Sequence, residues 1–188
     1  MNKILIVAML MICAACSGNS RGEMPKELQL YGNQIMYYYE DPTMDRLRMA
    51  IDYRGPALKI MYRECDASAY KHAITADSIF FALVNEKYNY GLYPDVDMDG
   101  VQWTSDKLTK HPVGYGGDLD YYWSAFFATG EFKWVDMVIT NIANSDSAIA
   151  GPARWSCRAN YRQHRKIKEY VDSKPELKEV IFADKKPG

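Results

Sequence analysis

Apolar residues recur at helical spacing through most of this chain, and this constrains its fold more than any other feature. The clearest run starts after Asp66, a residue that can cap the free amides of a helix, and continues to about Tyr88. Its apolar positions are Tyr70, Ala73, Ile74, Phe80, Phe81 and Val84. Because this spacing turns one face of each helix toward a core, we predict an all-α domain.

Glycine, proline and aspartate divide the rest of the chain into further helices. A start signal at Asp41-Pro42 and a stop signal at Gly55-Pro56 delimit one of them. Segment 121–128 is apolar almost all round, which predicts a central, buried helix. Together the patterns predict six or seven helices packed in pairs, at 41–55, 57–62, 66–88, 118–130, 132–144, 151–171 and 176–182.

Length and charge limit the classes of protein that remain. The chain has 188 residues, of which 48% are hydrophobic and 25% charged, the composition of one ordinary globular domain. We place this domain at residues 25–188. A formal net charge of -1 argues against a dedicated nucleic-acid binder, so we predict no nucleic-acid partner.

The helical period is lost between residues 89 and 117, where Gly, Pro, Asp and Tyr accumulate. We predict one long ordered loop here, with room for a strand at 101–103. The segment Gly114-Tyr115-Gly116-Gly117 is interpreted as a flexible break between helices. Loops of this length are usually functional or mobile.

The first 15 residues have the pattern of a signal peptide. A lysine at position 3 precedes the apolar run 4–12 and the small residues 13–16. The Ala14-Ala15-Cys16 ending resembles the lipobox of bacterial lipoproteins, with Cys13 where that family usually has Leu. The resemblance implies fatty acylation of Cys16, for example with palmitate, and a tether at 16–24. In that family Ser17 after the Cys implies the outer membrane, facing the periplasm. The alternative is plain secretion, in which the signal peptide is cleaved near this position.

Two cysteines remain in the predicted mature domain, Cys65 and Cys157. An oxidising compartment favours pairing them, and closing so long a loop would stabilise the fold by about 4 kcal/mol in the chain-entropy model. Two separate buried thiols are the alternative. Neither cysteine has the spacing of a redox or zinc motif.

The acidic segment after Pro94 has the spacing of a calcium loop. Asp95, Asp97 and Asp99 alternate before Gly100, and Asp106 stands at the twelfth position. Asp106 is shorter than the usual bidentate Glu, and no entering helix precedes the loop. A solvated acidic turn is therefore the alternative, and calcium is the only cofactor that the sequence suggests.

A basic row follows at helical spacing. Arg154, Arg158, Arg162 and Lys166 recur every four residues. Such a row could bind phosphates of lipid or lipopolysaccharide, or an acidic protein partner. The alternative is the solvated face of an amphipathic helix.

The sequence carries no recognised catalytic motif. His72, His111 and His164 lack the spacing of a zinc protease or a partner pattern for a triad, and His164 lies on an apolar stripe typical of a core histidine. Asp118 and Asp120 are too common a pair to assign to glycoside chemistry without geometry. The many tyrosines suit either a binding surface or a helical core.

Three segments also resemble an uncharacterised family of small helical bacterial proteins. They are Tyr37–Pro42, Asp120–Gly130, and Ala153–Ser156 with Asn160 and His164. The resemblance implies a helical fold and transfers no function. We therefore predict an envelope lipoprotein acting as a non-catalytic binding or structural module. A small envelope hydrolase with its site in loop 89–118, and a calcium-stabilised interaction domain, are the alternatives.

Overall fold

The computed structural model describes residues 24–92 and 96–183, and these form nine α-helices and two 3-10 turns. Within them the β-structure is limited to one isolated bridge between Val96 and Gln102, so the predicted all-α class is confirmed. The elements are α2 (Lys26–Glu40), α3 (Met44–Glu64), α4 (Ala67–Tyr88), α5 (Ser105–Thr109), η1 (Gly116–Asp118), α6 (Leu119–Thr129), α7 (Lys133–Thr140), η2 (Asn141–Ala143), α8 (Ser147–Gln163), α9 (Arg165–Asp172) and α10 (Pro175–Phe182).

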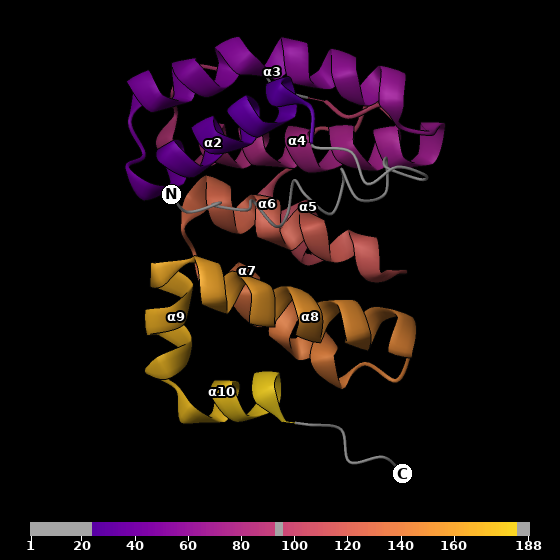
Figure 1. Cartoon of the computed structure of the whole chain (residues 1–188), viewed down its shortest axis with the longest axis vertical. Helices are drawn as coiled ribbons and strands as arrows, with labels where there is room; N and C mark the ends of the chain where they lie inside the picture. Colours follow the sequence, from indigo (N-terminus) through magenta and orange to yellow (C-terminus); the bar gives the residue numbers. More distant parts are fainter. Residues whose placement is uncertain (1–23, 93–95, 184–188) are drawn as a thin grey trace.

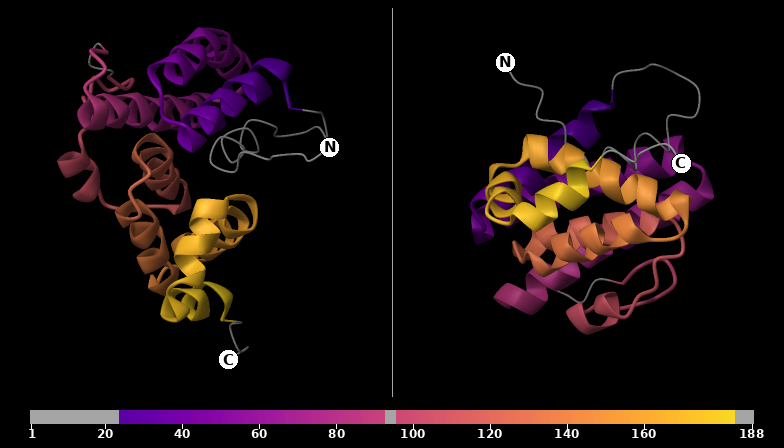
Figure 2. Two further views of the ribbon diagram at one scale, coloured as in Figure 1. Left: turned by 90° about the vertical axis from the view of Figure 1, so that its left-hand side faces the viewer. Right: turned by 90° about the horizontal axis from the view of Figure 1, so that it is seen from below.

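The helices stack as layers in chain order (Figure 1). α2, α3 and α4 form one end of the molecule, α6 lies below them, and α7 and α8 form the next layer. α9 runs across the stack and leads to α10 at the other end, as the side views also show (Figure 2). The predicted pairing of helices is visible in the contacts of α2 with α3, α4 with α6, and α6 with α7.

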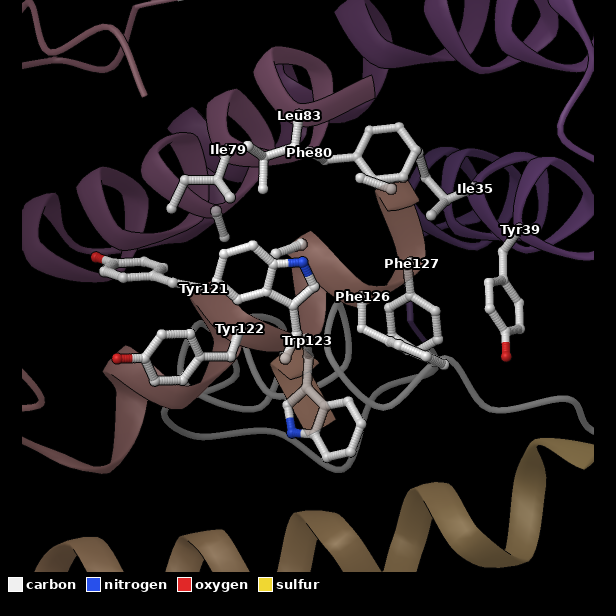
Figure 3. Packing of buried hydrophobic residues seen from close by; sticks show 14 of the residues in the cluster. Ile35, Tyr39, Ile79, Phe80, Leu83, Tyr121, Tyr122, Trp123, Phe126 and Phe127 are labelled. Carbon is white, nitrogen blue, oxygen red and sulfur yellow. The ribbon is translucent and has the colours of Figure 1, made fainter. Parts of the chain in front are cut away.

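Helix α6 is central and buried, as predicted. Figure 3 shows its aromatic side chains packed against Ile79, Phe80 and Leu83 of α4 and near Ile35 and Tyr39 of α2. Trp123 and Phe126 are fully buried. Gly130 ends the helix with a φ of +68°, a left-handed conformation that costs glycine no steric strain. Aromatic burial of this extent dominates the energetics of the core.

The predicted stop at Gly55-Pro56 is wrong, because α3 runs through both residues. Proline removes one helical hydrogen bond and disfavours a helical conformation in the residue before it, chiefly through that residue's Cβ. Here that residue is Gly55, which has no Cβ. Both residues are exposed, so water can reach the carbonyl left without its bond.

The predicted helix 151–171 is two helices. α8 starts earlier, at Ser147, because Asp146 accepts a hydrogen bond from the Ala148 amide. It ends at His164, whose extended backbone separates α8 from α9 and lets the apolar stripe continue at an angle. α2 is a further helix that the sequence patterns did not predict.

The predicted Cys65–Cys157 disulfide is not formed, because Cys157 is a free, buried thiol in α8. Cys65 follows α3, and α6 lies between these two helices (Figure 1). The predicted signal peptide (1–15) and Cys16 lie outside the described residues. None of the helices in the part of the chain that is described has the length and apolarity needed to cross a membrane.

Candidate functional site

A pocket of about 530 Å³ lies where α4, the start of α6 and the loop after residue 96 meet. α4 contributes Lys71 and His72 to its lining, the loop contributes Trp103 and Tyr115, and α6 contributes Tyr121. We call this space the loop pocket. Its volume is in the range that binds small molecules, and it lies in the segment where a functional loop was predicted.

Asp97 builds one wall of the loop pocket. Its Oδ1 accepts hydrogen bonds from the amides of Asp99 and Val101, both at 2.9 Å, and its Oδ2 accepts one from the indole of Trp103 at 2.9 Å. Gly100 has a φ of +74°, so the chain can turn sharply between these donors. The carboxylate therefore fixes the Trp103 ring in the wall.

His72 is held between three oxygen atoms at the base of the loop pocket. Its Nε2 lies 3.2 Å from Oδ2 of Asp120. Its Nδ1 lies 2.8 Å from the hydroxyl oxygen of Tyr115 and 3.0 Å from that of Tyr121. The His72 side chain is 13% exposed and that of Asp120 is 5% exposed. The ring also stacks on Tyr121 with centroids 4.8 Å apart.

The protonation pattern of this cluster follows from its geometry. A carboxylate only accepts, so Nε2 of neutral His72 carries the hydrogen and Nδ1 keeps the lone pair. That lone pair accepts one hydroxyl at a time, and Tyr115 is the nearer of the two. Burial raises the pKa of Asp120, although the hydrogen bond from His72 opposes this. Burial, and then the charges of Asp118 and Asp120, raise the pKa of Tyr115, which stays a protonated donor at neutral pH.

Tyr115 is held in place by its neighbours in the chain. Oδ2 of Asp118 accepts hydrogen bonds from the amides of Gly114 at 2.7 Å and Tyr115 at 3.2 Å. The Tyr115 ring lies against Gly117, where a Cβ would come within 2.3 Å of the ring. The segment 114–117, which was interpreted as a flexible break between helices, is therefore a tight turn that positions one side chain.

The predicted calcium loop is not assembled among the described residues. Asp95 lies outside them, and Asp97 uses both oxygens inside the loop. Asp99 pairs with Lys71 and Asp106 with Lys110, each at 2.8 Å. Across 24–92 and 96–183, no three His, Cys, Asp or Glu side chains come together to hold a metal ion. Lysine ammonium groups thus pair with two of the carboxylates.

The predicted basic row does not form one surface. Arg154 donates to the carbonyls of Val180 and Ala183, and Arg158 donates to that of Ile181 at 2.8 Å. Lys166 lies beyond the break at His164 and donates to the carbonyl of Tyr39 at the end of α2. These cations cap the C-terminal carbonyls of α10 and α2, where the helix dipole favours positive charge. Arg162 is exposed.

Of the histidines, His164 is a core residue as predicted, and His111 lies in the loop pocket with its ring against Trp103. His72 has a carboxyl partner that no sequence pattern indicated. Its partner Asp120 is 48 residues away in sequence, so no local motif links them. One signal was present: an aspartate at the start of an apolar helix must find a partner when it is buried.

The resemblances to bacterial lipoproteins and to small helical bacterial proteins remain predictions. Comparison of the chain with protein-family models, with curated proteins and with solved structures found no match.

Proposed function

We propose that this chain is an envelope lipoprotein whose helical domain binds a small molecule in the loop pocket. The observation that carries the proposal is the buried Asp120–His72 pair, which lies within hydrogen-bonding distance of the Tyr115 and Tyr121 hydroxyls at the lining of a pocket of about 530 Å³. Buried charge of this kind is costly and is a frequent feature of functional sites. Three of the four basic-row residues donate to carbonyls at helix ends, so the loop is the better candidate for a binding surface.

The lining favours a ligand with a planar body and an anionic group. Trp103, His111 and Tyr121 offer ring faces and edges on one side. Lys107 and Lys110 also line the pocket, and Lys107 donates to a carbonyl oxygen rather than to a carboxylate. Its positive charge is thus available to an anion.

Tryptophan fluorescence tests the pocket directly, with benzoate and phenyl phosphate as probes and neutral benzamide as the charge control. We expect the anions to change the emission of the protein in proportion to binding. Trp103→Phe should abolish the change, whereas Trp155→Phe should keep it, because Trp155 is 57% exposed on α8. At ten times Kd a ligand should raise the free energy of unfolding by about 1.4 kcal/mol. An emission change that survives Trp103→Phe, or no change with either anion, would contradict the proposal.

The anchor is tested separately in the native host. Metabolic labelling with a fatty acid should mark the wild-type chain and leave Cys16→Ser unlabelled, since the thiol is the predicted acylation site. The labelled protein should sediment with membranes, and the variant should not. Equal sedimentation of both forms without label would remove the lipoprotein part of the proposal and leave the pocket untouched.

A further inference from the structure

The loop pocket holds three side chains in the order of a nucleophile, a base and an orienting acid. The Tyr115 hydroxyl lies 2.8 Å from Nδ1 of His72, and Nε2 of the same ring lies 3.2 Å from Asp120. In hydrolases with a Ser-His-Asp triad, a hydroxyl, an imidazole and a buried carboxylate have these roles. Here the hydroxyl belongs to a tyrosine.

We propose that Tyr115 is a catalytic nucleophile for acyl transfer, with His72 as its general base and Asp120 as a positioning residue. This inference rests on the loop pocket of the proposed function but goes beyond reversible binding. The substrate class is an ester that enters the pocket and brings its carbonyl carbon to the Tyr115 oxygen.

Three observations support these roles. First, 52% of Tyr115 is exposed and the residue lines the pocket, so a substrate can reach its oxygen. Second, the tautomer that Asp120 enforces leaves the Nδ1 lone pair directed at a hydroxyl, as a general base requires. Third, Oδ2 of Asp120 lies 3.2 Å from Nε2 of His72, and both side chains are largely buried, so Asp120 fixes the orientation of the imidazole ring.

The proposed reaction has two stages, acylation of Tyr115 and hydrolysis of the tyrosyl ester. The Tyr115 oxygen bonds to the carbonyl carbon of the ester while its proton moves to Nδ1 of His72. The imidazolium, paired with Asp120, then gives that proton to the departing alkoxide, which leaves as an alcohol. A water molecule next attacks the tyrosyl ester and gives one proton to Nδ1. Phenolate leaves, takes the proton back and restores the site, with the carboxylic acid as the second product.

Gly117 and Asp118 have a positioning role in this scheme. The close approach of the Tyr115 ring to Gly117 and the two backbone bonds to Asp118 fix the hydroxyl beside His72. Such positioning is itself a large part of catalysis. A substitution at Gly117 should therefore displace the nucleophile without removing it.

A sulfonyl fluoride tests the nucleophile without knowledge of the natural substrate. Phenylmethanesulfonyl fluoride should form an oxygen–sulfur bond at Tyr115 as fluoride leaves, and the proton should pass through His72 to solvent. Tyr62 is the control inside the same molecule, because it is 72% exposed and its ring packs on Tyr70. Peptide mass spectrometry should show Tyr115 labelled about 100-fold faster than Tyr62, the contribution of a general base.

Variants separate catalysis from structure. His72→Ala should reduce labelling of Tyr115 to the rate of Tyr62, and added imidazole should restore part of it, which a purely structural role for His72 would not allow. Asp120→Asn should lower the rate about tenfold or more while hydrolysis of 4-nitrophenyl acetate falls in parallel. Tyr37→Phe should keep the labelling, since Tyr37 is 49% exposed on α2 and does not line the loop pocket. A melting curve for each variant identifies any that fail to fold.

Equal labelling of Tyr115 and Tyr62 would overturn the inference, as would preferred labelling of Tyr121 or a rate that does not respond to imidazole in a folded His72→Ala protein. Labelling of Tyr115 without any probe binding would support the nucleophile and reject the proposed anionic ligand. Probe binding without labelling would support the anionic ligand and reject the nucleophile.

Discussion

Buried polar side chains in this protein differ in how many of their polar atoms have hydrogen-bond partners. This difference determines whether a side chain stabilises the fold or responds to protonation. Asp97 has three protein donors and serves the loop, whereas Asp120 shares one oxygen with His72 and leaves the other unpaired. His164 is 3% exposed, and its Nε2 has no hydrogen-bond partner. A fully satisfied group stabilises, and a partly satisfied one is sensitive to protonation.

His164 should make the fold sensitive to acid. Burial lowers its pKa to about 4 from an ordinary value of 6.5, so the unfolded chain takes up a proton at higher pH than the folded protein. The stability of the neutral form is fully present above pH 6.5 and is lost as the pH falls toward 4. Between pH 7 and pH 4.5 the loss should be about 2 kcal/mol.

Urea unfolding of the wild type and His164→Phe at the two pH values measures this loss. Phenylalanine keeps a planar ring beside Tyr39 and Phe127 but cannot take up a proton. The wild type should lose about 2 kcal/mol more than the variant on acidification. An equal loss in both proteins would place the acid sensitivity in other groups.

Cys157 should be unreactive while the protein is folded. It is 2% exposed, and burial raises its pKa to about 12, so almost no thiolate is present at pH 8. Iodoacetamide should leave Cys157 unmodified in the native protein and alkylate it in denaturant, as peptide mass spectrometry would show. A Met98→Cys variant, at a position that is 56% exposed, is the positive control. Alkylation of native Cys157 at the control rate would contradict the buried environment.

At the scale of elements, one buried carboxylate joins three helices. Asp77 of α4 accepts a hydrogen bond from Arg54 of α3 at 2.6 Å and another from the Tyr31 hydroxyl of α2. The Asp77 side chain is 4% exposed and that of Arg54 is 25% exposed, so the pair is largely shielded from water. Arg54 also lies over the ring of Phe81. Removing either charge takes this buried ion pair from the other residue.

Asp77→Asn should therefore lower the free energy of unfolding by about 2–3 kcal/mol, somewhat below the value for a fully buried pair because Arg54 is partly exposed. Asp45→Asn is the matched control, since its pair with Arg48 is exposed on both sides and should contribute less than about 0.5 kcal/mol. Chemical denaturation of both variants measures the difference. Similar small losses would mean that water screens Arg54 more than its burial suggests.

Helices were predictable where local signals and packing agree, and not where tertiary contacts decide. α4 and α6 follow their apolar patterns and their caps, Asp66 and Gly130. The continuity of α3 depends on a glycine before its proline, and the break at His164 depends on which side chain is buried. Within the site, the segment 89–117 was predicted as one long loop, whereas the short helix α5 lies inside it. The partnership of His72 with Asp120 was not predicted, because folding alone brings α4 and α6 together.

At the scale of the whole molecule, cationic side chains from the second half of the chain close helix ends elsewhere. Lys166 of α9 donates to the carbonyls of Tyr39 and Glu40 at the end of α2, across the stack of layers (Figure 1). Its ammonium also lies 4.4 Å from the centroid of the Tyr39 ring. The same contact satisfies carbonyls that a helix leaves open and joins α9 to the first layer.

Lys166→Met should lower the free energy of unfolding by about 1–2 kcal/mol, because methionine keeps much of the apolar stem but loses the charge-assisted hydrogen bonds. Arg162→Met removes one positive charge from the same basic row at an exposed position and should cost less than about 0.5 kcal/mol. Urea unfolding compares the two at equal ionic strength. If both variants lose the same stability, net charge and not the bridge to α2 would explain the effect. If Lys166→Met alone is destabilised, the basic row stabilises the contacts between layers of helices. Its residues are then poor candidates for binding anions.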